Sequence, residues 1–426
     1  MKKLYESGQA SKAKKLAERF RKKYPGSVYQ SRARGIQSKS RGFERSTIQI
    51  GLLAPITGEN ADIGKFVVQG VKLAVDIYNK THTPKIELVI LDTKGNMVES
   101  AKKTKEMVDV HKASVIIGPV LSCNATVSAS VLMGDNDVVL ITPTATDDGI
   151  AQLGENVFQM NVTLGILGRK LARYSIETLN IKEFAIISPI SEYGKVLSSN
   201  FKDEAEKYGG EVIAVEYFDV GTNDFRIQFE SLRKKLAGRK WEQLALEGRP
   251  EYGKDAKGSR AARAKEAYLA DSTIEIGGLF IPAESEDVIK LTSQVYFHRI
   301  QTQLLGSNGW HTNATILGGK RYVNNAIIST NFEADKKNQK WVAFSKLYWE
   351  RFKENPDQVA APLGYDAANL VLNAINKKKV GYIVDQLRSV KNYHGVSGII
   401  SFDSEEGVNT ESAILKISNK KFIRIQ

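Results

Sequence analysis

The sequence predicts an α/β fold in which two lobes each hold a doubly wound parallel sheet, with a short α-helical segment at the N-terminus. Four short apolar runs alternate with amphipathic stretches between Ile48 and Thr146, and a second series of such units follows from residue 164. With 426 residues the chain is long enough for two to three domains. A strand–helix–strand succession forms a parallel sheet with right-handed crossovers, and such sheets bind ligands beyond the carboxyl ends of their strands.

Residues 1–28 predict a helix that ends at Pro25 and Gly26. Its apolar stripe consists of Ala10, Ala13, Ala17 and Phe20. This stretch resembles half of a tetratricopeptide repeat. A single unit of this kind cannot bury its own apolar face, so we expect further helices before Met1. Residues 29–46 are polar and basic without periodicity, which predicts a linker.

Most of the net charge of +13 lies in this N-terminal part, because residues 1–45 hold 14 Lys and Arg against 3 acidic residues. A basic tail can bind phosphates or anionic lipid headgroups. No base-stacking aromatics interleave the charges in the way that single-strand binders show, so a solvated surface is favoured and no nucleic-acid partner is expected. The single cysteine, Cys123, excludes an intramolecular disulfide. No apolar stretch approaches the roughly 18 residues of a transmembrane helix.

The first lobe is predicted from apolar runs that are too short for helices and rich in branched residues. These runs are Ile48–Ala54, Ile86–Asp92, Ser114–Gly118 and Val138–Thr142. Between these runs, apolar residues recur at helical spacing and predict helices at Gly64–Asn79, Val98–His111 and Asn124–Gly134. The turns that close the strands carry small hydroxyl residues, namely Thr57, Ser122, Thr144 and Thr146. We expect these turns to converge on one ligand.

The second lobe is predicted from three further strands, Phe184–Pro189, Glu211–Phe218 and Gly277–Ala283. Helices are expected near Gly168–Leu179, Lys195–Tyr208 and Asp224–Leu236. Residues 238–272 carry both charge signs and few large apolar residues, so we expect an exposed, partly helical insertion there. Such an insertion is either a mobile loop or a surface for a partner.

Seven segments resemble the type I periplasmic solute-binding proteins, specifically the leucine/isoleucine/valine-binding branch. They are IGLLAPITGENADIG, LDTKGN, VIIGPVLS, ITPTATDDGI, SEYGK, LLGSNGW and GYDAANL, in the order of that family. The resemblance implies lobe one at 47–163 and 309–395, and lobe two at 164–308 and 396–426. It places a closing strand at Gly398–Phe402 in lobe two. Three crossings between lobes imply a hinge that closes around a solute.

The resemblance also implies which residues contact the ligand. Ser122 falls on the carboxylate-binding serine, Thr144, Ala145 and Thr146 lie on the turn that contacts the head group, and Tyr193 matches the tyrosine that covers the ligand. Thr57 and Ile63 lie in the loop that sets side-chain selectivity. Asn308 stands where the family has an acidic partner for the ammonium group, and Ala283 stands where an aromatic wall is common. Because an amide brings no charge, the usual leucine pocket is altered here.

Structural alternatives stay open for several of these residues. Ser122 could only cap the next helix, and Tyr193 could only cover the hinge. Asp366 is expected to be a structural charge near a helix N-terminus. The five histidines lack metal-ligand spacing, and the chain has no P-loop, HExxH or GxSxG motif. We therefore expect neither catalytic residues, nor a metal, nor a cofactor.

Two functions remain. The first is an extracytoplasmic solute-binding protein that takes a small ligand, an amino acid or similar, and presents it to a membrane ABC permease. The second is a regulatory scaffold that resembles penicillin-binding protein activators and binds a peptidoglycan synthase. The resemblance implies a periplasmic or extracytoplasmic location. No apolar core of a signal peptide follows Met1, so either the signal lies upstream or this copy is cytoplasmic.

Overall fold

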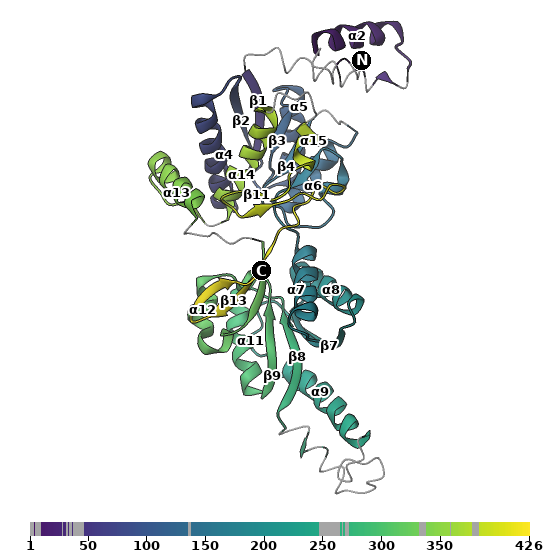
Figure 1. Cartoon of the computed structure of the whole chain (residues 1–426), viewed down its shortest axis with the longest axis vertical. Coiled ribbons are helices and arrows are strands. Elements are labelled where there is room, and N and C mark those ends of the chain that lie inside the picture. The colour runs from purple at the N-terminus through teal and green to yellow at the C-terminus, as the bar shows by residue number, and fades with distance from the viewer. Residues whose placement is uncertain are drawn as a thin grey trace. The chain divides into compact units, whose positions relative to one another are not determined.

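Two sheets organise the chain, one in each of two units (Figure 1). The computed structural model describes residues 10–27, 47–134, 138–246, 272–331, 338–357, 359–376 and 383–426, with the single positions 4, 29, 30, 33, 36, 265, 267 and 268. The first unit comprises Met1–Thr163 and Phe332–Glu411. The second comprises Leu164–Asn331 and Ser412–Gln426.

The sheet of the first unit is parallel throughout and has the strand order β2-β1-β3-β4-β5. Its strands are β1 (Thr47–Ala54), β2 (Lys85–Asp92), β3 (Val115–Ile117), β4 (Val139–Thr142) and β5 (Val157–Gln159). The helices of this unit include α4 (Ala61–Thr81), α5 (Met97–Asp109), α6 (Ser122–Val131), α13 (Gln339–Phe352), α14 (Ala360–Asn376) and α15 (Ile383–Arg388). The prediction of a parallel α/β lobe is confirmed.

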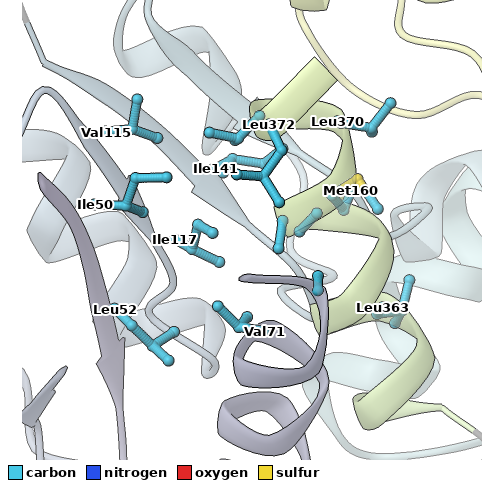
Figure 2. Close-up of a cluster of buried hydrophobic side chains, with 14 of the residues drawn as sticks. Ile50, Leu52, Val71, Val115, Ile117, Ile141, Met160, Leu363, Leu370 and Leu372 are labelled. Atoms are coloured by element: carbon cyan, nitrogen blue, oxygen red, sulfur yellow. The ribbon is translucent and has the colours of Figure 1, made fainter. Parts of the chain in front are cut away.

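Helices cover both faces of this sheet because alternate strand residues point to opposite sides. Ile50 and Ile117 pack with Val71 of α4 and Leu363 of α14, which converge in one cluster (Figure 2). On the opposite face, the strand residues Leu53, Ile116 and Leu140 pack with Met107 of α5 and Ala125 of α6. Burial on both faces explains the apolar runs of β3, of β4 and of residues 50–54 in β1.

The sheet of the second unit has the order β14-β13-β10-β9-β8-β6-β7. Its strands are β6 (Glu183–Pro189), β7 (Glu211–Phe218), β8 (Ile274–Ile281), β9 (Ile300–Gly306), β10 (Ile327–Thr330), β13 (Ala413–Ser418) and β14 (Lys421–Arg424). Strands β6 to β10 are parallel, whereas β13 and β14 are antiparallel to their neighbours. The helices include α7 (Leu164–Glu177), α8 (Glu192–Lys207), α9 (Arg226–Leu246), α11 (Ser285–Phe297) and α12 (Asn313–Gly319).

Two of the three lobe boundaries lie later than the sequence predicts. The first boundary between the two units falls between Thr163 and Leu164. The second boundary follows Asn331 instead of residue 308, and the third follows Glu411 instead of residue 395. Trp310 stays in the second unit because its indole N–H donates to Ile281 O and its ring is fully buried in that core. The predicted strand at 398–402 belongs to the first unit, where β12 (Ile399–Ile400) pairs with β11 (Tyr393–His394).

Helix α2 (Ala10–Lys23) lies near the N-terminus and buries Ala13 and Ala17 against Ala33 and Ile36. Gln30, Ala33 and Ile36, within the range 29–46 that the sequence predicts as a linker, are themselves helical. Helix α9 extends to Leu246 and so contains the start of the predicted insertion, of which residues 247–264 lie outside the described residues. Within the described ranges, no helix is both long and apolar enough to span a membrane.

Candidate functional site

Loops at the carboxyl ends of β1 and β2 are joined by Asp92. Its carboxylate accepts hydrogen bonds from Thr57 Oγ1 at 2.7 Å, from the Ile56 amide at 2.8 Å and from the Lys94 amide at 2.8 Å. Burial raises the pKa of the Asp92 carboxyl, but these bonds together outweigh burial and hold the pKa below its ordinary value. The hydroxyl proton of Thr57 is thus committed to Asp92. The sequence pattern alone indicates no role for Asp92, which lies in the LDTKGN segment.

The loops after β3 and β4 meet at Ser122. Its hydroxyl oxygen accepts hydrogen bonds from the Thr146 amide at 3.0 Å and the Asp147 amide at 3.3 Å. Thr144 Oγ1 donates to Val120 O at 2.6 Å and ties the same two loops together. Leu121 is the N-cap of α6, so the alternative that Ser122 merely caps this helix is wrong.

Two hydroxyl groups and the amide of Ala145, a residue that is only 1% exposed, have unpaired donors at this junction among the described residues. A serine hydroxyl has one proton and two acceptor positions, and both acceptor positions of Ser122 are taken by the amides. In the part of the chain that the structure describes, the hydroxyl protons of Ser122 and Thr146 and the amide of Ala145 make no hydrogen bond. Such a set of donors is suited to an anionic group such as a carboxylate.

Gly118 sets the position of the loop after β3. Its φ of 95° lies in the region that favours glycine, and a Cβ at this residue would stand 2.1 Å from Leu53 O. The close approach brings the chain that leads to Ser122 against the end of β1. Thr142 Oγ1 supports the same loop by donating to Pro119 O at 2.7 Å.

In the second unit, Tyr193 and Asn308 are in direct contact. The Ser191 side chain caps α8 and accepts from the Gly194 amide at 3.1 Å, which places Tyr193 in the first turn. The tyrosine hydroxyl donates to Asn308 Oδ1 at 2.9 Å and accepts from the Gly309 amide at 3.0 Å. Ser307 Oγ lies 2.8 Å from the same hydroxyl. Burial, and then the negative charge of Glu284, raise the pKa of Tyr193 far above its ordinary value, so the hydroxyl is neutral.

Three predicted residues take places that differ from the prediction. Ala283 is 0% exposed within the core of the second unit, so its methyl group lines no open surface; the next residue, Glu284, is the exposed one. Ile63 is half-buried on α4 and packs against the core of the first unit. Asp366 is not an N-terminal charge, because α14 begins at Ala360.

Asp366 instead holds a distant loop inside the first unit. Its buried carboxylate accepts from the amides of Val396 at 3.1 Å and Ser397 at 2.7 Å, and from Ser397 Oγ at 2.6 Å. Burial raises the pKa of Asp366 to about 6. Among the described residues, no group of three or more His, Cys, Asp or Glu side chains could hold a metal ion.

The sequence profile of the family described as periplasmic binding protein matches residues 47–420. The Leu/Ile/Val-binding protein homolog 3 of Brucella melitensis biotype 1 is 30% identical over 182 residues, which are 42% of this chain and 49% of that protein. The leucine-, isoleucine-, valine-, threonine- and alanine-binding protein of Pseudomonas aeruginosa is 26% identical over 192 residues, which are 44% and 51% of the two chains. The chain spans about half the length of these curated relatives.

Solved structures share the fold. The ABC transporter substrate-binding protein of Desulfitobacterium hafniense, in complex with Leu, superposes with a TM-score of 0.62 at 19% identity, over 89% of this chain and 100% of that one. The branched-chain amino acid transporter substrate-binding protein of Streptococcus pneumoniae, in complex with isoleucine, gives a TM-score of 0.58 at 23% identity, over 89% and 99%.

Proposed function

Because the chain belongs to the periplasmic binding protein family, we propose that it captures a small polar solute of the amino-acid type and presents it to a membrane ABC permease. Members of this family bind solutes and do not transform them. The two curated relatives are named for binding leucine, isoleucine and valine, and the two solved complexes hold leucine and isoleucine. We further propose a periplasmic or extracytoplasmic location, as the family description suggests.

The observation that carries the proposal is the set of available donors at Ser122, Ala145 and Thr146. A ligand carboxylate at this position would exchange its hydration water for fixed protein donors. Each charge-assisted hydrogen bond contributes about 1.5–3 kcal/mol to the binding free energy. The remaining predicted contacts, from Thr57, Ile63, Thr144 and Tyr193, are part of the same proposal.

Isothermal titration calorimetry with leucine, isoleucine, valine, threonine and alanine tests this function. We expect at least one of them to bind, and we expect Ser122→Ala to weaken binding about tenfold or more. Ser130→Ala is the matched control, because Ser130 lies on the same helix, is exposed, and only donates to Thr126 O. Absence of heat with every amino acid, or equal losses in both variants, would contradict the proposal.

A second candidate function, the regulatory scaffold, is favoured by one specific observation. Helix α2 buries Ala13 and Ala17 against Ala33 and Ile36, and this small cluster lies before residue 47, where the match to the family begins. In this proposal the tetratricopeptide-like segment and the segment 238–272 would contact a peptidoglycan synthase. The test is direct binding of a purified bifunctional synthase to the full chain and to a variant that lacks 238–272. Equal affinity of both, or no binding, would remove the scaffold hypothesis.

A further inference from the structure

We propose that the second unit holds a further binding site, which takes a sugar ring that carries a carboxylate group. The site is a pocket with a volume of about 330 Å³ between helix α11, strand β9 and the short helix η4 (Lys320–Val323) (Figure 1). Ligand pockets range from roughly 300 to 1,000 Å³, so this pocket suits a small ligand of one or two sugar rings. The site is independent of the proposed capture of amino acids.

The pocket is distinct from the turn after β9 that carries Asn308. It is lined by Ile300, Thr302 and Leu304, which alternate along β9 and therefore share one face of the sheet. Asn325, which precedes β10, lines it as well. Ile300 is the first residue of β9 and Asn308 follows the last one, and a strand of this length spans about 20 Å. A ligand at the amino ends of β9 and β10 therefore leaves the turn at Asn308 unoccupied.

Arg321 and two tyrosines form a cluster in the lining of the pocket. The Arg321 guanidinium lies 5.0 Å from the ring centre of Tyr322 and 5.5 Å from that of Tyr296, and its Nη2 atom donates to Tyr322 Oη at 3.2 Å. Among the described residues Arg321 pairs with no carboxylate, and no acidic residue lines the pocket with it. A guanidinium with free donors binds a carboxylate through two parallel hydrogen bonds. The charge of the pocket thus selects for an anionic group.

The other lining groups favour a sugar over an aromatic acid. The Tyr296 side chain is 69% exposed, so much of its ring surface is open to the C–H groups of a sugar. Within the part of the chain that the structure describes, Gln303 Oε1, Asn324 Nδ2 and the side-chain amide of Asn325 make no hydrogen bond. Hydroxyl groups both donate and accept, so they match this mixture of donors and acceptors. An aromatic carboxylate would pair with Arg321 and leave the three amides without partners.

Calorimetry on the full chain with D-galacturonate, D-galactose and benzoate tests the ligand class. We expect galacturonate to bind about tenfold or more tightly than galactose, which lacks the carboxylate, and than benzoate, which lacks the hydroxyl groups. Digalacturonate is a fourth ligand. Binding of it about tenfold more tightly than galacturonate would identify the end of an acidic polysaccharide as the source of the sugar, and equal binding a free sugar acid.

Two exposed residues of the pocket can be changed without disturbing the core. Arg321→Gln should weaken galacturonate binding about tenfold or more and bring it close to that of galactose. Tyr296→Ala should weaken binding of both sugars, because both place C–H groups on the ring. Lys320→Gln is the matched control, since this exposed cation precedes Arg321 in the chain and does not line the pocket.

Ser122→Ala separates this site from the one proposed for amino acids. The variant should bind galacturonate as the unaltered protein does, and L-leucine should not displace the sugar. Absence of galacturonate binding overturns the inference, as does loss of binding in Ser122→Ala with retention in Arg321→Gln. Benzoate that binds as tightly as galacturonate also overturns it, because the amides would then contribute nothing. Failure of every amino acid to bind would contradict only the proposed function.

Discussion

The buried carboxylate of Asp366 makes the stability of the first unit depend on pH in an unusual direction. Three donors from Val396 and Ser397 point at the carboxylate and favour its charged form. Complete burial opposes them and prevails, so the pKa rises from 3.8 to about 6. The perturbation that isolates this effect is Asp366→Asn, which keeps one acceptor oxygen and cannot ionise.

The magnitude follows from the pKa difference between folded and unfolded chains. Below pH 3.8 both states hold the proton, and between 3.8 and about 6 only the folded state holds it, so unfolding becomes easier as pH rises through this window. Two pKa units at 1.36 kcal/mol each amount to about 3 kcal/mol. Asp366 therefore lowers the free energy of unfolding by about 3 kcal/mol between pH 4 and pH 7. The Asn variant is expected to lack this decrease.

Urea denaturation of both proteins at a series of pH values from 4 to 8 gives the required measurement. The free energy of unfolding of Asp366→Asn minus that of the unaltered protein should rise by about 3 kcal/mol from pH 4 to pH 7. Ser397→Ala removes one donor to the carboxylate and should move the window to higher pH. A difference that stays constant with pH refutes the raised pKa. A difference that falls with pH would mean that the three hydrogen bonds outweigh burial.

Three further substitutions have defined outcomes. Ser122→Ala leaves two loop amides without an acceptor and should lower the free energy of unfolding by about 1–3 kcal/mol in urea, whereas Ser130→Ala should change it by less than about 0.5 kcal/mol. Tyr193→Phe removes a buried hydroxyl with three hydrogen-bond contacts and should cost about 1–3 kcal/mol, seen as a lower Tm. Gly118→Ala places a methyl group 2.1 Å from Leu53 O at positive φ and should cost about 1–3 kcal/mol in the same assay. Unchanged stability of Ser122→Ala, Tyr193→Phe or Gly118→Ala would contradict the contact that each of these substitutions changes.

The sequence predicts the first unit well because its strands are buried on both faces. Residues such as Ile50 and Leu53 belong to opposite clusters, so positions 50–54 of β1 are all buried and apolar, and the turns that follow are located by where each run stops. The meeting of the loops at Ser122 follows from the same rule, because carboxyl ends of parallel strands share an edge. The direction of each hydrogen bond does not follow, since it depends on which oxygen the neighbouring amides reach.

Asp366 shows a second limit of prediction. Its position within an amphipathic helix is visible in the sequence, but its partners at Val396 and Ser397 belong to a loop that follows α15. Nothing local to GYDAANL indicates a contact with that loop. The sequence therefore predicts a structural role for this carboxylate without its burial or its raised pKa.

The misplaced lobe boundary reflects β10 (Ile327–Thr330), which pairs with β9 and β13 in the second sheet although the sequence identifies no strand there. Strand β9 is missed as well, because its first half, with Gln301 and Gln303, lacks the continuous apolar character of the other strands. In the structure β9 lies beside β8 with Ile281 opposite Gly306, and the residues just beyond these two strand ends are therefore neighbours. Glu284 follows β8 and Asn308 follows β9, so the turns that bear them are neighbours in the structure, which the sequence does not predict while β9 goes unrecognised.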